Sequence, residues 1–195
     1  MELFDHMPLA VNVNGTYISL HGGISASLIQ LESINDIARV EEPRLDSPLF
    51  DILWADPLDE AKAVEQDYVT NENRGGKSVR FGTQPLKEFL AKNQVEALVR
   101  AHEVKQNGYQ FHFLSDETLQ PQCITVFSAP NYCGFYGNMG AVFCSKADKS
   151  THIETFSEVR NQPEVSQLAS TNANGCGIVI ERIDLINYQM SFLVE

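Results

Sequence analysis

Basic residues, cysteines and long apolar runs are all scarce in this sequence of 195 residues. Only 14 lysines and arginines stand against 26 aspartates and glutamates, so the net charge of −12 disfavours long-range attraction to nucleic acid or anionic lipid. No run approaches the roughly 20 apolar residues that a transmembrane helix needs. The first ten residues contain two acids where a secretory signal would be basic. These absences predict a protein without nucleic-acid or membrane partners.

The four cysteines show neither CxxC spacing nor the density of a small disulfide-bonded domain. They are Cys123, Cys133, Cys144 and Cys176. We interpret them as reduced thiols of a cytoplasmic protein, with a nuclear location also open. Cys133 follows a proline in a loop-like sequence, so we expect it to be accessible, whereas Cys123 and Cys144 lie in strand-like runs and should be buried.

The remaining composition, 43% hydrophobic and 21% charged, is typical of one globular domain. The acidic residues are concentrated, because residues 41–72 contain ten acids and only two basic side chains. We interpret this stretch as a solvated acidic face. The alternative is a docking surface for a basic partner.

Short apolar runs separated by turn residues predict many short strands and few helices. Asn14 and Gly15 between β-prone runs are typical of a hairpin turn. We expect short helical pieces in residues 28–40 and a helix of about two turns that includes Pro85 near its start. Strands are predicted at residues 95–100, 109–113, 123–127, 141–144 and 153–156, followed by a polar linker at 162–175 and a last pair of strands after 177.

Three side chains suited to binding or catalysis follow strand-like runs: His21, His102 and Tyr132. Ligand-binding residues of α/β sheets collect at such strand ends. Neutral imidazole is a common ligand of transition metals, but these two histidines lack the spacing of a short metal-binding motif. They are therefore interpreted either as ligands of one shared site or as structural residues. The other histidines are expected to be structural: His6, His112 and His152.

Arg74 lies in a loop-like sequence next to glycine. Its planar guanidinium can donate two hydrogen bonds to one phosphoryl group, a geometry that lysine does not offer. The alternative is an exposed arginine that pairs with neighbouring acids. The combination of imidazole, guanidinium and phenol side chains indicates phosphate chemistry.

Five short motifs follow one another along the chain: LHGG at 20–23, LWADP at 53–57, NRGG at 73–76, RAHE at 100–103 and SAPNYCG at 128–134. In these motifs and their spacing, residues 1–158 resemble the carboxyl-terminal half of the catalytic domain of the phosphoprotein phosphatases, the metal-dependent serine/threonine phosphatases. The segment DILWADPL looks closest to calcineurin, whereas NYCG looks more like protein phosphatases 1 and 5. The subfamily is therefore open.

The resemblance implies an α/β chain with a partial metallophosphoesterase fold, in which helices flank a central β-sandwich. It also implies that His21 and His102 ligate one ion of a two-metal centre of manganese, iron or zinc. Arg74 would bind phosphoryl oxygens, Tyr132 would line the substrate cleft, and Asp56 would organise the site from behind the metal ligands. Phosphoprotein substrates and a possible regulatory subunit follow from the same resemblance.

The sequence contains no GDxHG, GDxxDRG or GNHE segment. In the family these segments supply the other metal ligands, a second phosphate-binding arginine and the general acid. We therefore predict a serine/threonine phosphatase present as a partial catalytic domain, with about half of the site. The alternatives are an inactive binding or regulatory fragment that keeps the substrate groove and, less favoured, an enzyme for small phosphoesters. Residues 159–195 resemble no family tail and stay unassigned, as a possible linker with short strands.

Overall fold

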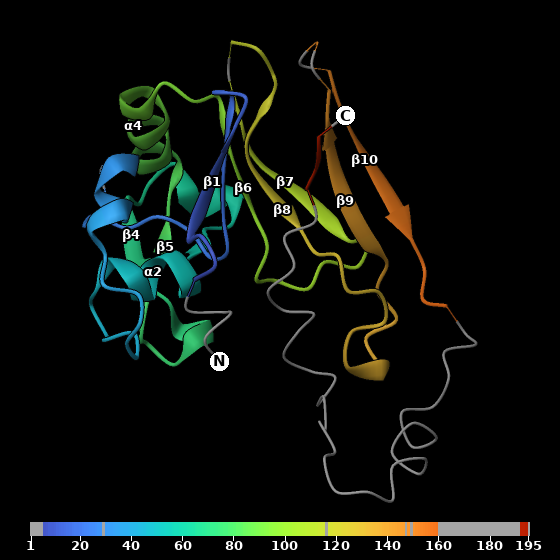
Figure 1. Ribbon diagram of the computed structural model, residues 1–195, viewed down its shortest axis with the longest axis horizontal. Helices are drawn as coiled ribbons and strands as arrows, with labels where there is room; N and C mark the ends of the chain where they lie inside the picture. Colours follow the sequence, from blue (N-terminus) through green and yellow to red (C-terminus); the bar gives the residue numbers. More distant parts are fainter. Residues whose placement is uncertain are drawn as a thin grey trace, which may run out of the picture.

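The computed structural model describes residues 6–28, 30–115, 117–146, 148, 150–159 and 192–194 (Figure 1). The helical elements are η1 (Leu31–Asp36), α2 (Pro48–Trp54), α3 (Glu60–Ala63), η2 (Glu72–Arg74), α4 (Thr83–Asn93) and η3 (Tyr132–Gly134). The strands are β1 (Ala10–Val13), β2 (Tyr17–Leu20), β3 (Asp56–Pro57), β4 (Tyr68–Thr70), β5 (Val79–Phe81), β6 (Ala97–Arg100), β7 (Tyr109–Leu114), β8 (Pro121–Val126), β9 (Gly140–Ser145), β10 (Thr151–Phe156) and β11 (Phe192–Val194). No described helix is long and apolar enough to cross a membrane.

A five-stranded sheet of order β1-β2-β6-β8-β7 forms the centre of the fold. Its three inner strands are parallel, with Leu20 of β2 opposite Arg100 of β6 and Arg100 opposite Thr125 of β8. The two edge strands are antiparallel to their neighbours. Because parallel strands end at the same edge, the loops that follow β2, β6 and β8 lie at one side of this sheet.

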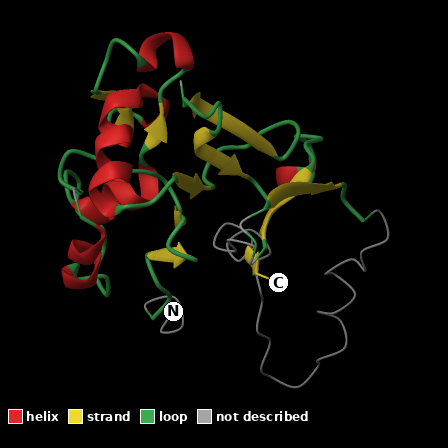
Figure 2. Cartoon of the chain, turned by 90° about the horizontal axis from the view of Figure 1, so that it is seen from above, coloured by secondary structure: helices red, strands yellow, loops and turns green. Residues whose placement is uncertain are grey.

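Two apolar cores lie on the two faces of the central sheet, because successive side chains of a strand point to opposite faces. Leu98 belongs to the larger core, which includes residues of α2, α4 and β5. Its neighbour Val99 packs with Ile124 and with Phe143 of the second sheet, β10-β9-β11. Most of the helices lie together at one side of the molecule, whereas the short η3 lies on the side of the second sheet (Figure 1 and Figure 2). The structure therefore confirms a β-sandwich with flanking helices.

Most of the expected elements are present, with one clear difference in β7. The hairpin turn forms at Asn14 and Gly15, both with positive φ, and α4 is longer than expected at 11 residues. In the sequence, Tyr109, Phe111 and Phe113 alternate with Gln110 and His112, which predicts a half-buried strand with the aromatic side chains on one face. That alternation is wrong, because Phe111 is 44% exposed while adjacent His112 and Phe113 are both buried. Phe113 has a φ of 54°, and this left-handed conformation interrupts the two-residue period of the strand.

The acidic stretch is not a uniformly solvated face. Asp51 and Asp56 are buried, at 7% and 2% exposure, whereas the other eight acids of residues 41–72 are exposed. Ser78 donates a hydrogen bond of 2.9 Å to Asp51 Oδ1, and burial raises the pKa of Asp51. The burial of these two acids corrects part of the interpretation from composition, since charge counts do not show which carboxylates have internal partners.

The predicted carboxyl-terminal segment lies almost entirely outside the described residues. This applies to the linker at 162–175, to Cys176 and to most of the strands expected after 177. The described part is β11, which pairs in parallel with β9. The boundary between residues 158 and 159 stays a prediction.

Buried His112 should make stability depend on pH. Its Nε2 lies 2.9 Å from Thr125 Oγ1, and burial, together with Lys105 and Arg100, lowers its pKa to about 3. The unfolded chain then binds a proton at higher pH than the native one, so stability is lost as the pH falls from about 6.5 towards 3. We expect His112→Gln to reduce the slope of unfolding free energy against pH by up to about 1.4 kcal/mol per pH unit.

Urea unfolding at a series of pH values between 7 and 4 measures this slope. The same substitution at exposed His6 is the control and should leave the slope unchanged. Equal slopes in the two variants would contradict the prediction.

Candidate functional site

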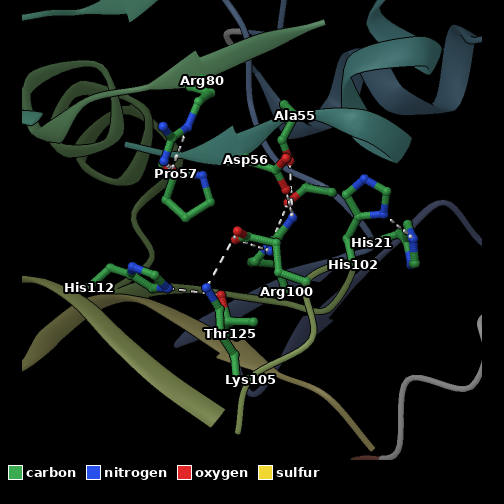
Figure 3. A network of polar contacts seen from close by, with 12 residues as sticks. His21, Ala55, Asp56, Pro57, Arg80, Arg100, His102, Lys105, His112 and Thr125 are labelled. Atoms are coloured by element: carbon green, nitrogen blue, oxygen red, sulfur yellow. Dashed lines mark hydrogen bonds and ion pairs between the residues drawn. The ribbon is translucent and has the colours of Figure 1, made fainter. Parts of the chain in front are cut away.

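His21 and His102 come together at the edge where the inner strands end. His21 directly follows β2 and His102 lies two residues after β6, which is paired with β2. His21 Nε2 is 3.0 Å from His102 Nδ1, with the ring centroids 4.8 Å apart (Figure 3). The two rings therefore converge as expected, and the parallel pairing of the strands is the reason.

Glycine at position 22 allows α2 to approach this edge closely. A Cβ at Gly22 would lie 2.6 Å from the carbonyl carbon of Leu53 and 2.7 Å from the backbone nitrogen of Trp54. Contacts this short are incompatible with any side chain. The approach places Trp54 beside His102, with ring centroids 5.3 Å apart and planes at 89°.

Behind the histidines, Asp56 lies between two arginines. It is 2% exposed, and its Oδ2 accepts hydrogen bonds from Asn71 Nδ2 at 2.8 Å and from Arg74 Nε at 2.9 Å. Its Oδ1 accepts from Arg100 Nη2 at 2.7 Å and from Arg74 Nη2 at 3.3 Å. One carboxylate thereby orients both guanidinium groups.

Arg100 connects this cluster to the surrounding backbone. Its fully buried guanidinium donates from Nε to the carbonyl of Gly22 at 2.6 Å and from Nη2 to that of Ala55 at 3.1 Å, and Nη1 donates to Glu103 at 2.9 Å (Figure 3). It therefore ties together the segments after β2, after α2 and after β6. This arrangement makes Arg100 a positioning residue of the site.

Arg74 is partly buried, and its contacts hold the guanidinium in one orientation. Its side chain is 24% exposed, and Nε and Nη2 both contact Asp56, while Nη2 also donates to the carbonyl oxygen of His102 at 3.4 Å. Within the described residues, Nη1 donates no hydrogen bond. The two-pronged contact predicted for phosphate is thus made with Asp56, and Nη1 is the group that remains to meet an anion.

The electrostatics keep Asp56 ionised and the two histidines neutral. Burial alone would raise the pKa of Asp56, but Arg100 and Arg74 hold it well below its usual range. Burial, followed by the charge of Arg100, lowers the pKa of His21 to about 4 and that of His102 to about 2. Neutral imidazoles next to a fixed guanidinium can bind a cation and an oxyanion side by side.

The donor set fits a metal ion, because two neutral ring nitrogens, His21 Nε2 and His102 Nδ1, face each other at 3.0 Å. The other ring nitrogen of His102 points away from this pair. This nitrogen, Nε2, is buried and has no hydrogen-bond partner in the part of the chain that the structure describes. A buried polar nitrogen without a partner is costly unless a ligand satisfies it. The amide oxygen Oδ1 of Asn71, whose Nδ2 donates to Asp56, is also buried and has no hydrogen-bond partner among the described residues.

Tyr132 and Cys133 lie in η3, in the loop between β8 and β9. The Tyr132 ring contacts Phe127 edge to face, with centroids 5.1 Å apart, and its backbone nitrogen donates to the side chain of buried Asn138. No described contact tests its predicted role at the substrate cleft. Cys133 is exposed and Cys123 is buried, as expected, but Cys144 is only half-buried, because its strand carries one sheet face that is partly open.

Sequence reasoning missed three residues of the site: Arg100, Asn71 and Trp54. Arg100 had a visible signal, since it is the one charged residue at the end of an otherwise apolar run in residues 97–100. Trp54 lies within the LWADP motif, but neither its contact with His102 nor that of Asn71 with Asp56 has a local signal, because each joins residues that are apart in the sequence.

The fold and these residues define a class of metal-dependent phosphoesterases. Residues 1–106 match the calcineurin-like phosphoesterase family, and the chain belongs to that family. It is 33% identical over 173 residues to serine/threonine-protein phosphatase 5 of Rattus norvegicus and 36% identical to that of Arabidopsis thaliana, covering 88% of this chain in both cases. Its homologues are thus serine/threonine protein phosphatases, and membership of the family implies divalent metal ions.

A solved structure agrees with the sequence comparison. The structure is a serine/threonine phosphatase from Saccharomyces cerevisiae described as similar to human phosphatase PP5, and it matches with a TM-score of 0.67 and 31% identity over 83% of this chain. The match confirms the mixed α/β metallophosphoesterase fold. The chain spans only about a third of the length of the curated relatives, 32% and 30%, and 50% of the solved structure.

Proposed function

We propose that this chain supplies one side of a metal-dependent active site that hydrolyses phosphoserine and phosphothreonine in proteins. The observation that supports this most directly is the facing pair of ring nitrogens, His21 Nε2 and His102 Nδ1, beside Arg74. Asp56 holds Arg74 through Nε and Nη2, and Nη2 also donates to the backbone oxygen of His102. In this proposal His21 and His102 hold a metal ion, and Arg74 binds the phosphoryl oxygens. Manganese, iron and zinc all suit imidazole ligands.

When bound, metal ions in such a site supply an activated water and neutralise charge on the phosphoryl group. The chain's own residues orient the groups that meet the substrate. Asp56 fixes the guanidinium plane of Arg74, and buried Arg100 fixes Asp56 and the backbone next to His21. Because these groups are held in place before binding, little reorganisation is needed when the phosphoryl oxygens arrive.

The chain alone should be a poor catalyst. The sequence contains no GDxHG, GDxxDRG or GNHE segment, so two imidazoles leave most positions of a two-metal centre to water, and the family's general acid is missing. A chimera tests this directly. In it, the part of the rat relative's catalytic domain that carries these segments precedes Met1, and hydrolysis of a phosphoserine peptide is measured with added manganese.

We expect negligible hydrolysis by the 195-residue chain, metal-dependent turnover by the chimera, and loss of turnover in the chimera with His102→Ala. Robust turnover by the chain alone would contradict the proposal that it supplies only one side of the active site. A folded but inactive chimera would favour the second function, an inactive fragment that binds phosphoproteins through the same surface. That alternative is favoured by the absence of the family's general acid segment.

A further inference from the structure

A second group of metal-binding side chains lies outside the site described above, on the β9–β10 hairpin. Cys144 is on β9, and His152 and Glu154 are on β10. The antiparallel register places His152 directly opposite Cys144, and Glu154 follows two residues later. All three side chains therefore lie on the same face of the second sheet.

The ligand atoms of this group are close to a metal-binding arrangement. The Cys144 Sγ, a ring nitrogen of His152 and a carboxylate oxygen of Glu154 all lie within 4.8 Å of one another. His152 Nε2 is 3.3 Å from Glu154 Oε1. Tetrahedral zinc, with bonds of about 2.0–2.3 Å, places two ligand atoms about 3.3–3.6 Å apart. The imidazole and the carboxylate already have this separation, and the thiol needs to approach by about 1.2 Å at most.

The ligand types favour a borderline transition metal. Thiolate and imidazole select zinc over magnesium or calcium, which prefer oxygen ligands alone. Three protein ligands leave the fourth position of a tetrahedral ion to water. Water can reach this position, because the side chains of His152 and Glu154 are 46% and 68% exposed. An exposed contact between two such side chains contributes little to stability by itself.

We propose that Cys144, His152 and Glu154 bind one zinc ion at a site separate from His21 and His102. The hairpin is at the side of the molecule away from α2 and α4 (Figure 1), whereas His102 contacts Trp54 of α2. β10 is an edge strand of its sheet. An ion bound to both strands ties this edge strand to β9, and zinc should therefore raise the melting temperature of the full chain by a few degrees.

Cobalt titration of the full 195-residue chain tests the proposal, because thiolate-bound cobalt has a characteristic charge-transfer absorption. We expect one equivalent of cobalt to produce this band and zinc to remove it. Cys144→Ser should abolish the band, whereas Cys133→Ser, which alters an exposed thiol in a loop, should leave it unchanged. His102→Ala should also leave it unchanged, so the result does not depend on the proposed phosphatase site.

His152→Ala is a second variant that keeps the test decisive if Cys144→Ser fails to fold, since His152 is exposed. It should weaken cobalt binding by at least about tenfold, because even the loss of a residue that only hydrogen-bonds to a metal ligand lowers metal affinity by that factor. The proposal is overturned if the wild-type chain shows no thiolate band, if the band survives in Cys144→Ser, or if His152→Ala binds cobalt as tightly as the wild type.

Discussion

Replacing Arg100 by methionine should lower the free energy of unfolding by about 3–5 kcal/mol, because removal of one member of a buried ion pair leaves the other charge uncompensated. Asp56 would keep only Arg74 as a charged partner, and the carbonyl oxygens of Gly22 and Ala55 would lose a hydrogen-bond donor. Methionine keeps the length and much of the volume of the arginine stem. The decrease in the free energy of unfolding therefore reflects the lost polar contacts more than lost packing. Urea unfolding followed by circular dichroism measures the effect.

Arg44→Met is the matched control for this measurement. The Arg44 side chain is 82% exposed and pairs with Glu41 at 3.8 Å. Arg44→Met should therefore change the free energy of unfolding by less than the experimental error. Asp56→Asn should destabilise the chain as Arg100→Met does, because two guanidinium groups then face a neutral amide. If Arg100→Met and Arg44→Met unfolded at the same urea concentration, the buried cluster would not be a source of stability.

In the active chimera, Arg74→Ala should reduce kcat/KM by roughly thirty- to a hundred-and-fifty-fold. A charge-assisted hydrogen bond to a phosphoryl oxygen is worth about 2–3 kcal/mol, and the structure leaves Nη1 to make it. Arg74→Ala also removes a partner of Asp56, so the kinetics must be measured where unfolding curves show both proteins to be folded. Steady-state assays with a phosphoserine peptide give the ratio.

Two further variants separate the role of the Arg74 charge from its structural role. Arg74→Lys keeps the charge but loses the two-pronged contact with Asp56, and we expect an intermediate loss of kcat/KM. Arg80→Ala removes an arginine that contacts Asp59 and the carbonyl of Pro57, and it should leave kcat/KM unchanged. Kinetics of Arg74→Ala equal to those of the unsubstituted chimera would make Arg74 only a structural partner of Asp56.

The sequence by itself determined the elements whose signals are local. Asn14 and Gly15 tolerate the positive φ of a hairpin turn, and the apolar run that ends at Leu20 matches a buried strand. The placement of His21 and His102 just after two strands was also readable, since both positions follow from where apolar runs stop. The motifs around them were sufficient to indicate the family that the comparisons confirm.

Only the tertiary structure decided how the charged residues of the site are paired. Arg74 and Arg100 are far from Asp56 in the sequence, and no spacing rule indicates that one carboxylate accepts hydrogen bonds from both. The presence of two adjacent buried residues in β7, His112 and Phe113, likewise depended on the left-handed φ of Phe113, which no pattern of apolar residues reveals. Hydrophobic periodicity specifies which face of an element is buried, whereas ion pairs and ligand clusters depend on which elements become neighbours after folding. The same reason explains why Cys144, His152 and Glu154 came together as a candidate zinc site only when the register of β9 and β10 was known.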